Sequence, residues 1–304
     1  MLGVLAKLIS RHLARLPRPT LQRRGARLGW FVARVVRHRR AEARAALTRS
    51  LPELSQTETT AALDGMYRNL ALNLVEILRM YGGATDELNA LMTIAGEEHV
   101  QSALARGRGA LVLTAHLGNF DMLGMFAAYR HYPLTIISKR IKNAAINQIW
   151  SALRERFGIQ ILFAPNTARG CLKALKANGL VGFMIDQNRP RNQGVFVQFF
   201  GRPACTTPGL AILSSQAQAP VIPIFISRRA DGTHLLQIQP LLEPPPDRES
   251  ATILRYTQLY TTITERAIRQ HPEQWTWIHR RWKTQPEPGD AVASPGPDAL
   301  PVSA

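Results

Sequence analysis

The sequence has few cysteines and no recognisable metal-ligand spacing, and both absences restrict the class of protein. Cys171 and Cys205 are the only two cysteines, which is too few for a disulfide framework. No Cys-x-x-Cys pair or His-x-x-x-His pair accompanies them. We therefore expect a chain without a metal that works in a reducing, cytoplasmic compartment.

Long uncharged apolar runs are also missing near the N-terminus, where arginines interrupt every apolar stretch. No uncharged apolar run there reaches the length of about 20 residues that spans a bilayer. The interrupting arginines also disfavour a cleaved signal peptide. The uncharged stretch 203–227 contains Pro208, Pro220 and Pro223 and is polar in its middle. It predicts a short helix from about Thr207, followed by a buried strand.

Acidic residues are nearly absent from the first 50 positions. This segment holds 13 Lys and Arg against one acid, Glu42, and so carries +12 of the net charge of +17. Large apolar residues, including Trp30 and Phe31, alternate with the arginines at helical spacing. A basic amphipathic helix with aromatic residues favours an anionic membrane surface. A nucleic-acid arm is the alternative, but it would have no use for the apolar residues, so no nucleic acid is expected.

Three regions are predicted for the 304 residues, of which 45% are hydrophobic. Residues 1–50 form basic amphipathic membrane-docking helices, residues 51–284 form one α/β domain, and residues 285–304 form a disordered Pro-rich tail. Periodicity predicts helices at 20–48, 56–81, 119–130, 144–157, 168–178 and 249–270, and strands at 109–115, 134–138, 159–163, 180–185, 195–200, 221–227 and 234–239. The fold class is α/β, with a mixed, largely parallel sheet flanked by helices.

A histidine and a carboxylate follow the first strand of this pattern. His116 and Asp121 stand in the sequence His-Leu-Gly-Asn-Phe-Asp directly after the apolar run 110–115. The carboxyl end of such a strand opens onto the ligand crevice, and a turn there can bring the Asp121 carboxylate to the His116 ring. The carboxylate would fix the tautomer of a general base. A capped helix beside a structural histidine is the competing interpretation.

Further motifs follow in order. They are Lys139-Arg140-Ile-Lys-Asn143, Gly-Phe-Met-Ile-Asp186-Gln187-Asn, Val-Gln-Phe-Phe-Gly201, and the final His271-Pro-Glu-Gln-Trp-Thr-Trp-Ile-His-Arg-Arg-Trp-Lys283. With the His-x4-Asp pair, this set resembles the lipid A late acyltransferases, within the broader lysophospholipid and glycerolipid acyltransferases. The resemblance covers residues 1–284.

The resemblance implies a membrane-associated enzyme that moves a fatty acyl chain from an acyl thioester to a hydroxyl of a lipid A precursor. The donor is acyl carrier protein or coenzyme A, and no cofactor is needed. His116 is the expected general base and Asp121 its orienting partner. No covalent intermediate is expected, because no Ser or Cys stands in a nucleophile motif. The expected location is the cytoplasmic face of the bacterial inner membrane.

Substrate contacts are expected from polar residues near the strand ends. These residues are Asn119, Lys139, Arg140, Asn143, Asp186 and Gln187. Relatives commonly have Tyr-Arg-Pro before the residue matching Asn143; this chain departs from that pattern. Counting back places their arginine at Lys139, which leaves open whether Lys139 or Arg140 binds an anion. A solvated basic loop, and an Asp186 paired with Arg189 or Arg191, are the structural alternatives.

Two questions stay open from the sequence. Trp275, Trp277 and Trp282 alternate with basic residues, which suits either a membrane-headgroup rim or core packing. The acceptor is also open: a lysophospholipid or a phosphatidylinositol mannoside is the alternative to lipid A. A non-catalytic membrane-binding or nucleic-acid-binding protein is the alternative outside enzymes.

Overall fold

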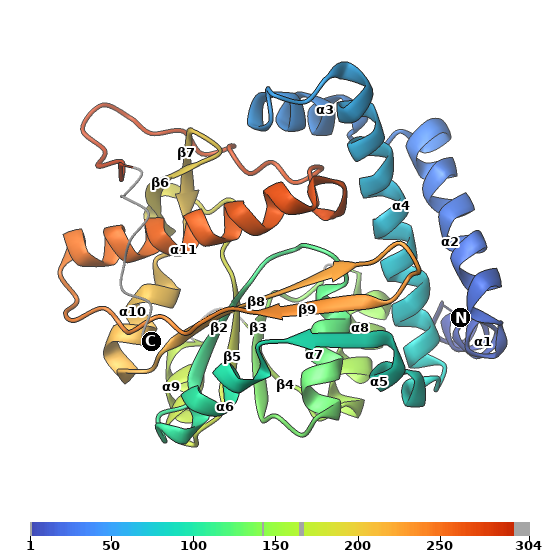
Figure 1. The fold of residues 1–304 in the computed structure, drawn as a ribbon, viewed down its shortest axis with the longest axis horizontal. Helices are drawn as coiled ribbons and strands as arrows, with labels where there is room; N and C mark the ends of the chain where they lie inside the picture. The colour runs from blue at the N-terminus through green and yellow to red at the C-terminus, as the bar shows by residue number, and fades with distance from the viewer. Residues whose placement is uncertain (1, 142, 164–166, 295–304) are drawn as a thin grey trace.

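A seven-stranded sheet forms the centre of the protein (Figure 1). The structure is a computed structural model that describes residues 2–141, 143–163 and 167–294. In spatial order the strands are β1 (Met92–Ala95), β9 (His234–Ile238), β8 (Val221–Arg228), β2 (Ala110–Thr114), β5 (Leu180–Met184), β3 (Leu134–Ser138) and β4 (Gln160–Phe163). Neighbouring strands are parallel, except that β8 and β9 are antiparallel. The predicted mixed, largely parallel sheet is confirmed.

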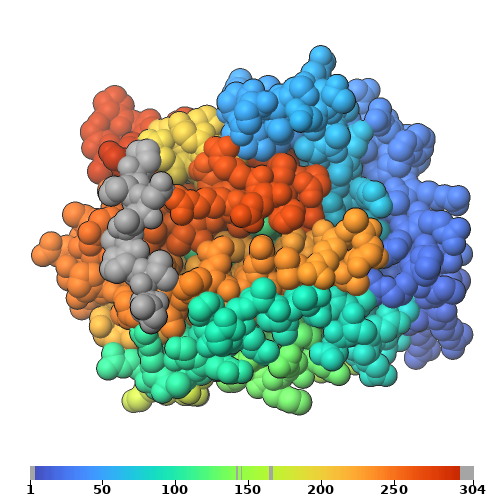
Figure 2. All heavy atoms as spheres, in the orientation of Figure 1, coloured from blue at the N-terminus to red at the C-terminus, as the bar shows by residue number. Residues whose placement is uncertain are grey.

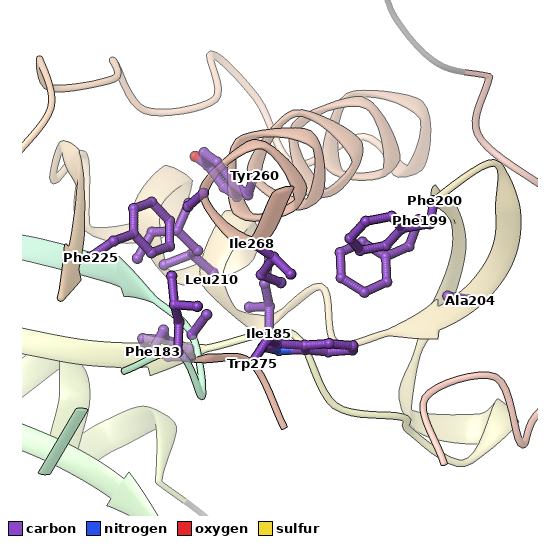
Figure 3. Close-up of a cluster of buried hydrophobic side chains, with 14 of the residues drawn as sticks. Phe183, Ile185, Phe199, Phe200, Ala204, Leu210, Phe225, Tyr260, Ile268 and Trp275 are labelled. Carbon is purple, nitrogen blue, oxygen red and sulfur yellow. The ribbon is translucent and has the colours of Figure 1, made fainter. Parts of the chain in front are cut away.

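Helices cover both faces of the sheet, and alternating strand residues divide the core between them. On β2, Ala110 and Val112 belong to the hydrophobic cluster that includes residues of α6 (Glu97–Ala105), α7 (Phe120–Tyr129) and α8 (Ala144–Arg156). Leu111 and Leu113 belong to the cluster of the other face, with α9 (Ala168–Lys176), α10 (Gly209–Ala217) and α11 (Ser250–Gln270). Figure 3 shows part of this second cluster, with Phe183 and Trp275 beneath α11.

Four parallel strands, β8, β2, β5 and β3, are neighbours at the centre, so their carboxyl ends lie at one edge of the sheet. Residues that follow these strands are therefore close in space although they are far apart in sequence. This edge receives the segment after β2, which contains His116, and the segment after β5, which contains Asp186.

Helices α1 and α2 lie along one edge of the molecule, outside the long helix α4 (Figures 1 and 2). The elements before β1 are α1 (Leu2–Arg15), α2 (Arg18–Phe31), η1 (Val32–Val36), α3 (Arg40–Ser50), α4 (Gln56–Tyr81), η2 (Thr85–Glu87) and α5 (Leu88–Leu91). The predicted helix at 56–81 is confirmed as α4. It begins with a capping box, in which Ser55 and Glu58 bond to each other's backbone N–H groups.

The prediction of one helix over 20–48 is wrong. The chain ends α2 at Phe31, continues through the π-helical turn η1, and starts α3 at Arg40. Arg37 and Arg39 both take a positive φ there, at 53° and 51°. No Gly or Pro announces this break. Tertiary packing accounts for it, because the Tyr67 hydroxyl donates to the His38 carbonyl and both α2 and α3 pack on α4.

The strand predicted at 195–200 exists as β6 (Val195–Phe199), but it does not join the sheet as expected. It pairs antiparallel with β7 (Arg202–Thr206) in a separate hairpin. The turn uses Phe200 and Gly201, both at positive φ, which matches the twist of a tight hairpin. Strand β7 is not predicted from the sequence, because Pro203 weakens its strand signal, and β1 and α6 are not predicted either.

The first part of the predicted disordered tail has defined contacts. Within 285–294, Asp290 pairs with Arg191, and the backbone N–H of Ala293 donates to the Phe196 carbonyl of β6. These contacts follow η3 (Arg191–Gln193) and the hairpin, so the tail prediction is wrong for 285–294. Residues 295–304 lie outside the described part of the chain.

Candidate active site

The His116 side chain is held by a buried carboxylate, and that carboxylate belongs to Asp186. Asp186 Oδ1 lies 2.8 Å from His116 Nδ1, and Oδ2 accepts from the His116 backbone N–H at 2.8 Å. The Trp275 indole N–H also donates to Oδ2, at 2.8 Å. Since a carboxylate only accepts, Nδ1 carries the proton and Nε2 presents a lone pair. This is the tautomer that a general base requires.

The strand register explains why these two residues meet. Thr114 of β2 pairs with Met184 of β5 in the parallel ladder. His116 and Asp186 each follow that pair by two residues, so they leave the sheet side by side at the same level. Asp186 is only 2% exposed. A buried charge is stable only with good hydrogen-bond partners, and here three donors supply them.

The charges of Asp186 and His116 shift each other's pKa in opposite directions. Burial works to raise the pKa of Asp186, but the charge and hydrogen bond of His116 and the bond from Trp275 outweigh it and lower the pKa to about 2. Burial likewise works to lower the pKa of His116. The charge of Asp186, its hydrogen bond and the more distant charge of Asp121 outweigh this effect and raise the His116 pKa. The pair thus stabilises the imidazolium that forms when Nε2 takes a proton.

The prediction that Asp121 orients His116 is wrong. Asp121 lies in the first turn of α7 and accepts from two side chains of α8, Arg154 at 2.7 Å and the Trp150 indole at 3.2 Å. The backbone turns at Gly118, which has a φ of +55°, so α7 leads the carboxylate away from the ring of His116. Asp121 acts on His116 only through space, by raising its pKa.

The Gln187 side chain bonds to the ring nitrogen of His116 that carries no proton. Its Nε2 amide lies 3.0 Å from His116 Nε2, and the amide N–H donates to the lone pair of the ring. The Gln187 side chain is exposed. A group that gives a proton to His116 Nε2 would have to take this position, which the Gln187 amide fills in the structure.

The two asparagines expected at the substrate are helix caps. Asn119 is buried, and its Oδ1 accepts from the Met122 N–H at the start of α7 while its Nδ2 donates to Glu76. The prediction of a substrate contact from Asn119 is therefore wrong, since its side chain is enclosed. Asn143 caps α8 by accepting from Ile146 N–H and is exposed. It thereby fixes the helix that holds Asp121.

The basic loop follows β3 and reaches the same edge of the sheet as His116. Lys139 and Arg140 are both exposed. The Arg140 guanidinium lies over the Phe163 ring, 4.5 Å from its centre, which turns it toward the end of β4. Lys142, part of the same motif, lies outside the described residues.

The tryptophans of the last motif are part of the core. Trp275 and Trp277 are each 1% exposed, so the headgroup-rim alternative is excluded for both. Arg281 is fully buried and donates to the Cys205 carbonyl and the Thr206 hydroxyl, which ties the motif to β7. Trp275 contacts the site directly, since its indole N–H bonds to Asp186.

A buried polar network behind the histidine was missed from the sequence. Asn69, Asn73 and Glu76 share one face of α4, and all three bind the Arg228 guanidinium at the end of β8. Asn73 Nδ2 also donates to the Gly118 carbonyl at 2.7 Å. His234 lies beside Glu76, and the network lowers the pKa of Glu76 to about 2 against the effect of burial.

This network fixes the loop that carries His116 at residues that do not bond to Asp186. Glu76 and Asn73 hold two successive residues of the motif, Asn119 and Gly118. The signal available in the sequence was three polar residues at positions i, i+4 and i+7 of an otherwise apolar helical face. Polar residues on such a face need partners, and a motif loop is one source of them.

The fold and this geometry define an α/β enzyme with a carboxylate-oriented histidine at the carboxyl edge of its sheet. Among residues 2–141, 143–163 and 167–294, no group of three or more His, Cys, Asp or Glu side chains is arranged to hold a metal ion. In the same residues, no helix is long and apolar enough to cross a membrane.

Comparison with known proteins places the chain in a family. Residues 2–284 match the family model of bacterial lipid A biosynthesis acyltransferases, so the chain belongs to this family and is an O-acyltransferase. It is 26% identical to the lipid A biosynthesis lauroyltransferase of Escherichia coli over 280 residues, 90% of this chain and 89% of the relative.

Two further relatives differ in the acceptor that their names state. The lipid A biosynthesis palmitoleoyltransferase of E. coli is 27% identical over 89% of this chain and 87% of the relative. The phosphatidylinositol mannoside acyltransferase of Mycobacterium tuberculosis is 30% identical over 62% of this chain and 59% of the relative.

Replacing Asp186 should change both the rate and its pH dependence. In Asp186→Asn the amide no longer enforces the productive tautomer, so we expect turnover to fall by about 10³-fold or more. A histidine that acts as a base reacts in its neutral form, and Asp186 raises the pKa of His116. The acidic limb of the pH–rate profile should therefore move to lower pH in the variant.

Asp121→Asn is the matched control for this measurement. It removes one carboxylate from the same motif without breaking the bond to Nδ1, so its acidic limb should move less. A larger shift in Asp121→Asn than in Asp186→Asn would contradict the assignment of Asp186 as the partner of His116.

Replacing Asn73 should separate positioning from stability. Asn73→Ala leaves the Gly118 carbonyl without its donor, and we expect a loss of about 1–3 kcal/mol in the free energy of unfolding together with roughly tenfold slower turnover at an unchanged KM. Asn69→Ala removes another Arg228 partner that does not bond to the motif loop. It should lose similar stability in urea denaturation and keep its kcat; equal kcat losses in both variants would refute a positioning role for Asn73.

Proposed function

We propose that this O-acyltransferase moves a fatty acyl chain from an acyl thioester to a hydroxyl of a lipid A precursor, with His116 as general base. The single observation that supports this most is the His116–Asp186 pair, which leaves Nε2 as the basic nitrogen. The names of the relatives from E. coli support lipid A as the acceptor.

The reaction proceeds by direct transfer. His116 Nε2 takes the proton of the acceptor hydroxyl as its oxygen attacks the thioester carbonyl carbon. The tetrahedral intermediate collapses with cleavage of the C–S bond, and the proton on His116 passes to the leaving thiolate. Asp186 stabilises the imidazolium between these two steps. The enzyme needs no cofactor beyond its thioester co-substrate.

A covalent enzyme intermediate has little support in this chain. Both cysteines are buried, and burial raises the pKa of Cys171 to about 11, so the thiol is not activated. Thr114, the last residue of β2, is also buried. His116 therefore activates the substrate hydroxyl rather than a protein nucleophile.

The donor is the thioester of acyl carrier protein or coenzyme A. Acyl carrier protein is acidic and coenzyme A carries phosphates, so both suit a basic surface. Lys139 and Arg140 are the cations at this edge of the sheet that bind the donor phosphate or the developing oxyanion. Because Arg140 already lies over Phe163, Lys139 is the better placed of the two.

The N-terminal helices dock the enzyme on the cytoplasmic face of the inner membrane as a peripheral protein. Their exposed large apolar side chains are Val4, Leu5, Leu8, Ile9, Leu28, Trp30, Phe31, Val35 and Val36. These residues lie among the arginines of residues 1–50, which suit anionic headgroups at about 1 kcal/mol each. Arg39 bonds to the Ile278 carbonyl, and Thr276 bonds to the His116 carbonyl, so this surface adjoins the site.

A second acceptor, a phosphatidylinositol mannoside, has one specific point in its favour. The mycobacterial relative named for it is 30% identical, although it matches only 62% of this chain. The mechanism would be the same, and only the source of the hydroxyl would differ.

The experiment that tests the activity is mass spectrometry of lipids from a late-acylation-deficient bacterial strain. With the natural chain, lipid A should gain one acyl mass, and His116→Ala should abolish the gain by removing the base, a loss of at least about 10³-fold in rate. His99→Ala, on α6, should leave it intact. A gain that survives in His116→Ala would refute the mechanism. An acyl mass gained by another lipid would show that this lipid, and not lipid A, is the acceptor.

Membrane docking is tested separately by flotation of the purified chain with anionic vesicles. Trp30→Ser and Phe31→Ser together should weaken binding by at least about tenfold, since each exposed ring contributes roughly 1–3 kcal/mol when it leaves water. Tyr129→Ser, on α7, removes another exposed aromatic ring as the control. Unchanged binding in the Trp30 and Phe31 variant would contradict docking through this surface.

A further inference from the structure

A hollow lies where α1 crosses the end of α4. Its lining residues are Arg11, Ala14 and Arg15 of α1, and Gly82, Gly83 and Ala84 after α4, and its volume is about 370 Å³. We refer to it as the α1 hollow. Gly82 permits this arrangement, because a Cβ at position 82 would lie 2.1 Å from the Ser10 carbonyl oxygen. The close approach of α1 to the end of α4, beside which the hollow lies, thus depends on glycine at position 82.

The two arginines of the α1 hollow are exposed cations without an acidic partner. Among the residues that the structure describes, no carboxylate lies within ion-pair distance of Arg11 or Arg15. Arg79, near the end of α4, is different, because it pairs with Glu87 and donates to the backbone carbonyls of Leu13 in α1 and of Leu16 just after it. Two unpaired guanidinium groups around one hollow suit a phosphate, which accepts bidentate hydrogen bonds from arginine.

The same side of α1 is apolar beyond the hollow. Val4, Leu8, Arg11 and Arg15 follow one another at spacings of four, three and four residues, so they form one strip along the helix. Val4 is 65% exposed and Leu8 is 58% exposed. The strip changes from apolar to cationic as it approaches the hollow. A soluble phosphate compound would leave the apolar half uncovered, whereas a lipid presents both a phosphate and hydrocarbon.

We propose that the α1 hollow binds the headgroup phosphate of an anionic membrane lipid, with the lipid's hydrocarbon against Val4 and Leu8. This site deepens the proposed function, since it rests on membrane docking by the N-terminal helices. It differs from general attraction by the +12 segment, because it assigns a specific role to two arginines out of twelve and to the shape around them.

The test is binding of the full chain to phosphatidylcholine vesicles with and without phosphatidic acid. Arg11→Gln with Arg15→Gln is compared with Arg23→Gln and Arg27→Gln, two exposed arginines of α2 that do not line the hollow. Both pairs lose the same charge. The hollow pair should lose at least about tenfold more affinity for the phosphatidic acid vesicles than the α2 pair.

A charge-neutral variant tests the shape of the site. Ala14→Leu fills the α1 hollow and leaves every arginine in place. It should also weaken binding to the vesicles with phosphatidic acid, and leave binding to vesicles of phosphatidylcholine alone unchanged. Circular dichroism and retained acyl transfer in detergent show that the variants fold.

Each outcome decides between the proposals. Equal losses in the two arginine pairs, or full binding by Ala14→Leu, would overturn the hollow as a phosphate site and leave membrane docking in place. Weaker binding of inorganic phosphate by the hollow variants, with vesicle binding equal to that of the natural chain, would assign the site to a soluble phosphate compound instead. If the natural chain does not bind vesicles at all, both the hollow proposal and membrane docking fail, while acyl transfer is unaffected.

Discussion

The Asp186 carboxylate is a buried anion, and much of the site follows from the need to satisfy it. Water does not reach it, so its oxygens take three hydrogen bonds from two other segments of the chain. His116 supplies a ring nitrogen and its backbone N–H, and Trp275 supplies its indole. The end of β2, the end of β5 and the last motif therefore meet at one point, and the histidine ring is fixed in the tautomer that leaves Nε2 basic.

A second set of buried charges holds the same loop from behind. Glu76 and Arg228 form an ion pair inside the protein, which is stable only because Asn69, Asn73 and Asn119 complete its hydrogen bonds. The loop that bears His116 thus bonds to two anions, Asp186 at His116 and Glu76 at Asn119. Each anion bonds to the loop directly, so the backbone between β2 and α7 has little freedom before substrate arrives.

The sequence predicted the largely parallel sheet and the position of His116 at its carboxyl edge, but not the carboxylate that binds the His116 ring. Strand order and register are properties of the whole fold, and only the pairing of Thr114 with Met184 shows that His116 and Asp186 are level. Proximity in sequence favoured Asp121 instead. The break between α2 and α3 was missed for a related reason, because long-range packing overrode the local helix preference at positions without a Gly or Pro signal. The separate β6–β7 hairpin was missed because the strand pattern at 195–200 does not show which strand it pairs with.

The long helix α4 joins the site to the N-terminal surface. Asn73 bonds to the loop of His116, and Gly82, nine residues later, lies at the α1 hollow, about 14 Å along the helix axis. Arg156 of α8 donates to the Tyr81 carbonyl near the same end, and α8 also holds Asp121. A lipid phosphate bound in the hollow would therefore fix the orientation of α4 relative to the membrane. Because α4 also carries the network behind His116, such anchoring would set the direction from which a membrane-embedded hydroxyl reaches Nε2.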